Sequence, residues 1–105
     1  MSERPFPFLK FARALPSEIR IPIRVVNFRE IHADFVGSER VDQASRCIDC
    51  GNPYCSWGCP LGNLIPEWLK LAREGRVEDA ATLMHETNPL PKICGRVCPH
   101  DRLCE

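Results

Sequence analysis

The sequence predicts a small all-α domain that follows an extended N-terminal arm and carries its cysteines on loops around a helix hairpin. Three observations lead to this fold class. Two segments in the second half space their apolar residues as one face of a helix, nothing after residue 38 alternates convincingly, and four prolines interrupt residues 1–37. We therefore divide the 105 residues into an arm, 1–37, and a helical domain, 38–105.

The arm is predicted to contain no long helix, because each proline fixes one backbone angle and removes a hydrogen-bond donor. Ile21, Ile23 and Val25 alternate with other residues in the manner of an edge strand. Pro22 lies within that run and removes a donor from the ladder, so this interpretation is weak. The alternative is that these apolar side chains lie on a partner.

A short helix is predicted to lead into the first cysteine, Cys47. Ser38 is a candidate N-cap, because a serine hydroxyl can accept a hydrogen bond from a free N–H at the start of a helix. Val41, Ala44 and Ile48 would share one face of this helix.

The helix hairpin is predicted from residues 63–87. Pro66 suits the opening turn of its first helix and Gly75 suits the end. Glu78 and Asp79 complement the dipole at the start of the second helix, which should end at Asn88-Pro89. The expected apolar faces are Ile65, Trp68, Leu69 and Ala72 in the first helix and Val77, Ala80, Ala81 and Met84 in the second.

Composition excludes several classes of function. Fourteen basic and fourteen acidic residues give a net charge of zero without a basic stripe, which argues against a nucleic-acid partner. No apolar run approaches the ~20 residues that cross a bilayer, and the start of the chain lacks the apolar region of a signal peptide. We therefore expect a cytoplasmic protein without a membrane partner. Seven cysteines in a reducing compartment indicate metal binding or redox chemistry rather than disulfides.

The first cysteine group reads RCIDCGNPYCSWGCP, with the spacing C-x2-C-x4-C-x3-C-P. Closely spaced thiolates on an irregular segment can wrap several corners of a cubane iron–sulfur cluster. In ferredoxin-like runs the cysteine that precedes proline binds the other cluster of a pair. By that rule Cys47, Cys50 and Cys55 hold one [4Fe-4S] cluster and Cys59 belongs to a second.

The second cysteine group, ICGRVCPHDRLCE, supplies further candidate ligands. Cys98, which precedes a proline, and Cys104 are assigned to the cluster of Cys59. Cys94 is interpreted as a free thiol beside a cluster rather than a ligand. Two cubanes need about eight ligands, and the chain reaches Glu105 within the ligand run. We therefore expect further ligands beyond that residue.

Zinc is the main rival to iron, since four cysteines also form a tetrahedral zinc site in an interaction module. Zinc ribbons, however, usually separate two C-x2-C knuckles, whereas here four thiolates fall within thirteen residues. No Ser/His/Asp arrangement, phosphate loop or nucleotide fingerprint occurs, so we assign no catalytic residue. Trp57 and Trp68 are expected to cover the clusters and fill the small core. The three histidines are separated and are not expected to bind metal; they are His32, His85 and His100.

Two stretches, RCIDCGNPYCSWGCPLGNLIPEWLKLAREGR and NPLPKICGRVCPHDRLCE, resemble the N-terminal region of the small subunit of bacterial NADPH-dependent glutamate synthase. The likeness is specific from residue 46 to 105 and looser at RVVNFREI. Six cysteines match the ligand cysteines of that family, namely Cys47, Cys50, Cys55, Cys59, Cys98 and Cys104. No ligand role is carried over to Cys94.

The resemblance implies an all-helical domain with two [4Fe-4S] clusters, followed by FAD- and NADPH-binding domains. It implies an oxidoreductase in which electrons pass from NADPH through FAD and the clusters to the large (alpha) subunit. There they would support glutamate synthesis from glutamine and 2-oxoglutarate. Related modules occur in dihydropyrimidine dehydrogenase and in ferredoxin-NADP transhydrogenase, and the cysteine motif alone does not separate them. On this reading we expect residues 1–105 to be a truncated fragment that is not catalytic alone.

Overall fold

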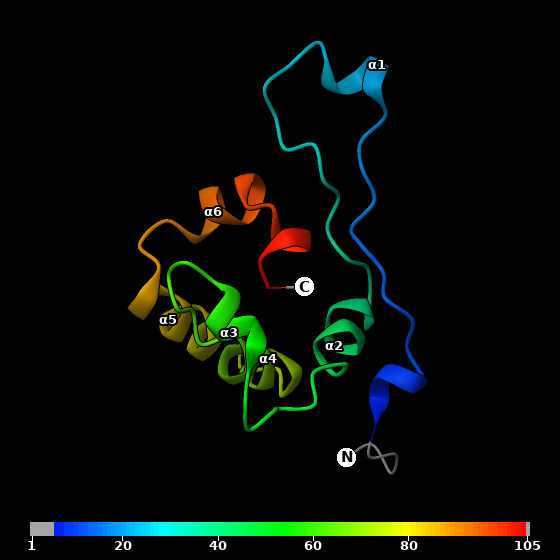
Figure 1. Ribbon diagram of the computed structural model, residues 1–105. Coiled ribbons are helices and arrows are strands. Elements are labelled where there is room, and N and C mark those ends of the chain that lie inside the picture. The colour runs from blue at the N-terminus through cyan, green and yellow to red at the C-terminus, as the bar shows by residue number, and fades with distance from the viewer. Residues whose placement is uncertain (1–5, 105) are drawn as a thin grey trace.

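Figure 1 shows the helices of the chain in a computed structural model that describes residues 6–104. The elements are η1 (Pro7–Leu9), α1 (Ile21–Arg24), α2 (Glu39–Ala44), α3 (Tyr54–Gly58), α4 (Ile65–Arg73), α5 (Val77–Thr87), α6 (Pro91–Val97) and η2 (His100–Arg102). Residues 6–104 contain no β-strand, which confirms the predicted all-α class. Nor is any helix in this range long and apolar enough to cross a membrane.

Helix α4 is the centre of the helical part. It forms the predicted hairpin with α5 and also packs against α2 and α3. Pro66 lies in its first turn, where a backbone N–H would have no partner within the helix. At the end of α5, Thr87 Oγ1 donates a hydrogen bond to Asn63 Oδ1 over 2.6 Å. This bond holds the end of α5 beside the start of α4.

The turn between α4 and α5 confirms the predicted stop at Gly75. This glycine has a φ of +81°, a left-handed conformation that glycine adopts without a steric penalty. Its N–H donates to the carbonyl of Ala72 (3.2 Å), and the N–H of Arg76 donates to the carbonyl of Leu71 (2.9 Å). These two bonds form a Schellman motif, which satisfies carbonyls that the helix end leaves free.

The apolar face of α4 is as predicted, since Ile65, Trp68, Leu69 and Ala72 are all partly shielded from solvent. The face predicted for α5 is wrong at two positions. Val77 is 47% exposed and Ala81 is also exposed. The shielded stripe starts instead at Ala80 and follows helical spacing; its members are Ala80, Leu83, Met84 and Thr87. Val77 and Ala81 flank this stripe on the side of the solvent.

Helix α2 begins after Ser38 as predicted, but the serine does not cap it. Ser38 already has helical backbone angles (φ −84°, ψ −3°), whereas an N-cap residue needs an extended conformation to turn its oxygen toward the helix. Its hydroxyl donates to the Asp42 carboxylate instead, over 3.1 Å. The helix also ends early, at Ala44, so Ile48 lies outside it and is 50% exposed.

The arm runs out from the helical part and returns, with α1 at its tip (Figure 1). Two backbone hydrogen bonds join its legs, from Ile19 N–H to the carbonyl of Ile31 (2.7 Å) and from Ala33 N–H to the carbonyl of Ser17 (2.8 Å). The division of the chain at residue 37 stays a prediction.

The weak prediction of an edge strand around Pro22 is wrong, because this segment forms the single helical turn α1. Pro22 lies in the first turn, which its fixed φ suits. The strand-like pairing that residues 6–104 do contain is one isolated bridge between Glu18 and His32.

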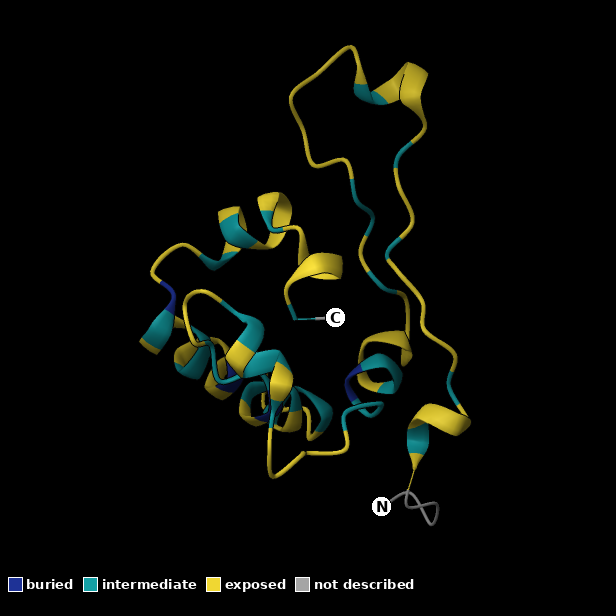
Figure 2. Cartoon of the chain, viewed as in Figure 1, coloured by how far each residue is buried: buried dark blue, intermediate teal, exposed yellow. Residues whose placement is uncertain are grey.

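The buried core is thin. Among residues 6–104, the buried apolar side chains in the helices are Ala44 and Ala80, each 5% exposed, together with Pro66. Figure 2 shows the burial confined to the helical part, while the arm is exposed or partly exposed. Trp68 is partly shielded, but Trp57 is 62% exposed and packs edge-on against Tyr54. The prediction that Trp57 fills the core is therefore wrong.

Candidate iron–sulfur site

Helices α3 and α6 end in the same way, at a cysteine that precedes a proline. Cys59 caps α3 and donates its N–H to the carbonyl of Cys55 (3.2 Å). Cys98 caps α6 and donates its N–H to the carbonyl of Cys94 (2.9 Å). Both caps are extended, with ψ of 121° and 126°, because the following proline ring clashes with a helical conformation of the residue before it.

Asp49 lies between the candidate ligands Cys47 and Cys50 and has a left-handed φ of 53°. Aspartate is one of the few residues other than glycine that visit this conformation readily. Burial raises the pKa of the Cys47 thiol, and a hydrogen bond from the Asp49 backbone N–H opposes that shift. Cys55 and Cys50 raise the same pKa further through charge repulsion. Cys50 and Cys55 are therefore electrostatic neighbours of Cys47.

Gly58 allows the end of the chain to approach α3 closely. A Cβ at this position would collide with the carbonyl oxygen of Leu103 and would lie 3.4 Å from the Cα of Cys104. Because the colliding atom belongs to the backbone, it could not swing away as a flexible side chain could. The absence of a side chain at Gly58 thus brings Cys104 beside the helix that leads to Cys59. Sequence reasoning missed this role, and a glycine immediately before a candidate ligand cysteine was the available signal.

Cys104, in the second cysteine group, lies close to the first, because its Cα is beside Gly58. Burial is the main cause that raises the pKa of its thiol, and repulsion from Cys98, Cys55 and Cys59 raises it further. The fold thus brings together cysteines that are separated by the whole helix hairpin in sequence. All seven cysteines are free thiols.

The Cys94 thiol is hydrogen-bonded to the residue that follows α5. Its thiol donates a weak hydrogen bond to Asn88 Oδ1 over 3.6 Å. Asn88 is 4% exposed, and the same oxygen accepts the N–H of Leu90 over 2.9 Å. Cys94 therefore lies against the loop between α5 and α6.

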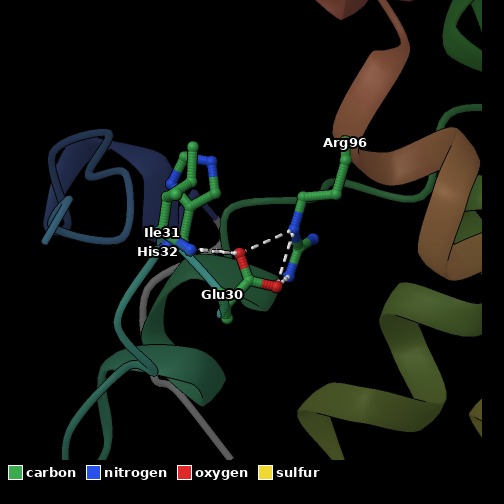
Figure 3. Close-up of polar contacts among 4 residues, drawn as sticks. All are labelled: Glu30, Ile31, His32 and Arg96. Carbon is green, nitrogen blue, oxygen red and sulfur yellow. Dashed lines mark hydrogen bonds and ion pairs between the residues drawn. The ribbon is translucent and has the colours of Figure 1, made fainter. Parts of the chain in front are cut away.

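Glu30 and Arg96 form an ion pair that sequence reasoning did not find, because the two residues are 66 positions apart. Figure 3 shows Arg96 reaching from α6 to the Glu30 carboxylate. Arg96 Nη2 lies 2.6 Å from Glu30 Oε2, and Arg96 Nε lies 3.1 Å from each carboxylate oxygen. Glu30 Oε1 also accepts the backbone N–H groups of Ile31 (3.0 Å) and His32 (3.2 Å). The hydrogen bond from Arg96 is the largest cause that lowers the pKa of Glu30 to about 2.

Within residues 6–104, no three cysteine, histidine or acidic side chains converge closely enough to hold a single metal ion. The ligand roles of the six predicted cysteines therefore remain a prediction. The thiols do suit a cluster in their chemistry, because several potential thiolate donors occur on short segments and a backbone N–H lies near the Cys47 sulfur.

Residues 24–105 match the family described as dihydropyrimidine dehydrogenase domain II, 4Fe-4S cluster, and the chain belongs to this family. It is thus an iron–sulfur domain. This match favours iron over the zinc alternative, and it agrees with the all-helical architecture and the two cysteine groups.

Individual relatives give a more specific comparison than the family as a whole. The chain is 51% identical to the glutamate synthase [NADPH] small chain of Escherichia coli over all 105 residues, which make up 22% of that protein. It is 44% identical to the glutamate synthase [NADPH] small chain of Azospirillum brasilense over 104 residues, 99% of this chain and 22% of the relative. The putative oxidoreductase AegA of Escherichia coli is 46% identical over 95 residues, 90% of this chain and 14% of the relative. The chain therefore spans about a fifth of the length of the glutamate synthase relatives it matches.

Proposed function

We propose that this chain is the electron-transfer module of a glutamate synthase small subunit. Likeness along nearly all of this chain to two glutamate synthase [NADPH] small chains is the observation that carries the proposal. When bound, iron–sulfur clusters accept and release single electrons at potentials set by their surroundings. The chain's own residues would bind the clusters, shield their sulfurs and fix the distance between the two clusters. We assign no catalytic residue.

The proposed ligands form two sets of three cysteines. Cys47, Cys50 and Cys55 would hold the first [4Fe-4S] cluster, in keeping with their electrostatic proximity. Cys104, whose neighbours include Cys98 and Cys59, would hold the second with them. The charge of Cys55 also acts on the Cys104 thiol, which supports the proposal that the two sets are neighbours. The hydrogen bond from Cys94 to Asn88 supports its exclusion from both sets.

The proposed partners follow from the same likeness. Electrons would arrive from NADPH through FAD on further domains of the small subunit and leave to the large (alpha) subunit. That subunit would make glutamate from glutamine and 2-oxoglutarate. We place the protein in the cytoplasm, as the seven free thiols favour. The division into an arm, 1–37, and an iron–sulfur domain, 38–105, belongs to this proposal, as does the absence of nucleic-acid or membrane partners.

A second candidate is the same module in another flavin oxidoreductase. The family carries the name of dihydropyrimidine dehydrogenase, and AegA is a putative oxidoreductase with 46% identity. The two candidates differ in the electron acceptor. Glutamine-dependent NADPH oxidation in the presence of 2-oxoglutarate and a large subunit supports glutamate synthase, and activity with an unrelated acceptor alone supports the second candidate.

The binding test is anaerobic purification of the full natural protein, followed by iron, sulfide and zinc analysis. A brown protein with a broad visible band and stoichiometric iron and sulfide is the expected result. A colourless protein with stoichiometric zinc would overturn the proposal.

Single serine variants test the two ligand sets. Replacement of Cys59 should remove the same reduced electron paramagnetic resonance (EPR) signal as replacement of Cys98, because both are assigned to the second cluster. If the Cys59 and Cys55 variants lose one signal and the Cys98 variant loses the other, the assignment of Cys59 is wrong.

A further inference from the structure

Helix α6 carries the second cysteine group but takes no part in the close packing of the helices. In the described part of the chain, every closely packed helix pair includes α4, and none includes α6. The buried apolar side chains lie in α2, α4 and α5. The position of α6 therefore depends on contacts outside the helical core.

The arm faces α6 across a hollow interface. A pocket of about 290 Å³ lies between them, lined from the arm by Pro16, His32 and Phe35 among others and from the other side by Gly95, Arg96 and His100. Because the interface is hollow, apolar packing across it is incomplete. The ion pair between Glu30 and Arg96 bridges the two sides directly.

The geometry of this pair suits a positioning role. The guanidinium meets the carboxylate through two nitrogens, which fixes orientation as well as distance. Glu30 is itself held by the N–H groups of Ile31 and His32, so its carboxylate cannot swing freely. Both side chains are more than 40% exposed, and exposed pairs add little to global stability. The effect of the pair should therefore be local to α6.

We propose that Glu30 is a positioning residue for the second cluster: through Arg96 it fixes the end of α6 and so the Cys98–Cys104 segment. Arg96 precedes Cys98, the cap of α6, by two residues. Displacement of this helix end would move a ligand relative to Cys59 and Cys104. This inference rests on the proposed function, because it assumes a cluster at these cysteines.

The test uses three variants of the full natural protein, isolated anaerobically. Glu30→Gln and Arg96→Gln each break the ion pair from one side, and Arg96→Gln leaves in place the bonds that Glu30 accepts from the N–H groups of Ile31 and His32. Arg96→Lys is the conservative variant, since it keeps the charge. The matched control is Glu18→Gln, which breaks an ion pair inside the arm, with Arg24 at 3.1 Å. Glu18 also lines the pocket, but this substitution leaves the Glu30–Arg96 pair and every side chain of α6 unaltered.

Two measurements decide the matter. Hydrogen exchange of the α6 amides should become several-fold faster in both glutamine variants and should be partly restored in Arg96→Lys. In both glutamine variants the reduced EPR signal of the second cluster should also decay several-fold faster in air. The signal of the first cluster should decay at an unchanged rate. If the two residues acted on the cluster only through their charges, Glu30→Gln and Arg96→Gln would change its decay in opposite directions, because they remove charges of opposite sign. The control should match the unaltered protein in both measurements.

The role of the Glu30–Arg96 pair in holding α6 and the proposed function can fail separately. If α6 exchange is unchanged in both glutamine variants, the ion pair does not hold α6, whatever the iron content. The same conclusion follows if Glu18→Gln speeds α6 exchange as much as they do. Absence of iron from the unaltered protein would overturn the proposed function. Faster exchange with an unaffected second cluster would overturn the positioning role.

Discussion

Helices α3 and α6 share one local pattern, Cys-x3-Cys-Pro, but occupy different surroundings. Both end at the second cysteine with an extended cap. Helix α3 packs on α4 and receives Leu103 against Gly58, whereas α6 is joined to the arm through Arg96. The proline thus determines how each helix ends, and tertiary contacts determine which cysteines meet.

The first cysteine of each pattern shows the difference most clearly. Cys55 is an electrostatic neighbour of both Cys47 and Cys104. Cys94, at the same place in the second pattern, donates to Asn88 instead. Two identical local motifs therefore need not have the same function, and the four predictions below test how far this difference extends.

The largest expected effect separates the two first cysteines. Cys55→Ser should remove the first cluster, because a hydroxyl is a poor substitute for a thiolate ligand. Cys94→Ser should leave both clusters in place, because its thiol makes only a weak hydrogen bond. Iron content and the reduced EPR spectrum of the full natural protein check both outcomes. Equal iron loss in the two variants would show that the motifs are equivalent after all.

The next effect concerns the glycines of the two helices. Gly58→Ala should force Leu103 away and cost about 1–3 kcal/mol, the usual range for overpacking, with preferential loss of the second cluster. Gly95→Ala in α6 is the matched control, since its added Cβ would meet nothing within 4 Å. Urea unfolding together with iron analysis measures the effect. A Gly58 variant that behaves like the Gly95 variant would rule out the close approach.

An effect on stability alone, without preferential loss of a cluster, is expected where α6 begins. Asn88→Ala should lower the free energy of unfolding by about 1–3 kcal/mol, because the N–H of Leu90 loses its acceptor in a partly buried place. Asn27→Ala provides the comparison, since Asn27 makes similar bonds on the exposed arm and should cost below about 0.5 kcal/mol. Urea unfolding midpoints of the two variants show which substitution costs more stability. Equal costs would mean that burial of Asn88 has no energetic consequence.

The smallest effect is a pH dependence at the arm. The pKa of Glu30 is lowered to about 2 from its usual 4.5. The stabilisation that the ionised carboxylate gives the folded chain is therefore present above pH 4.5 and is lost as pH falls through about 2. Carbon-13 NMR titration of the Glu30 carboxyl group in residues 1–105 should show this low value. Arg96→Gln should bring the pKa back toward 4.5, whereas Glu18→Gln should leave it unchanged. A pKa near 4.5 in the unaltered chain would contradict the ion pair.

Sequence reasoning succeeded where the controlling interactions are local. The helix hairpin followed from Pro66, Gly75 and the spacing of apolar residues, all of which act within a few positions. The family likeness likewise rests on the short cysteine motifs. The ligand roles of the individual cysteines are still predictions.

The errors arose where distant or competing contacts decide. Ser38 was expected to cap α2, but its hydroxyl bonds to Asp42 and its backbone is already helical. Val77 fits an apolar stripe by spacing, yet which stripe meets α4 depends on how the two helices pack. The pair of Glu30 and Arg96 joins positions that no local pattern connects.

The thin core also affects how the protein should respond to denaturants and heat. Apolar surface exposed on unfolding sets both the heat-capacity change and the slope of stability against urea. With only small buried apolar side chains such as Ala44 and Ala80 in the described helices, both quantities should be low for the metal-free chain. Its urea transition should therefore be broad. A chain that holds clusters should unfold more sharply, because release of a bound cluster couples to unfolding.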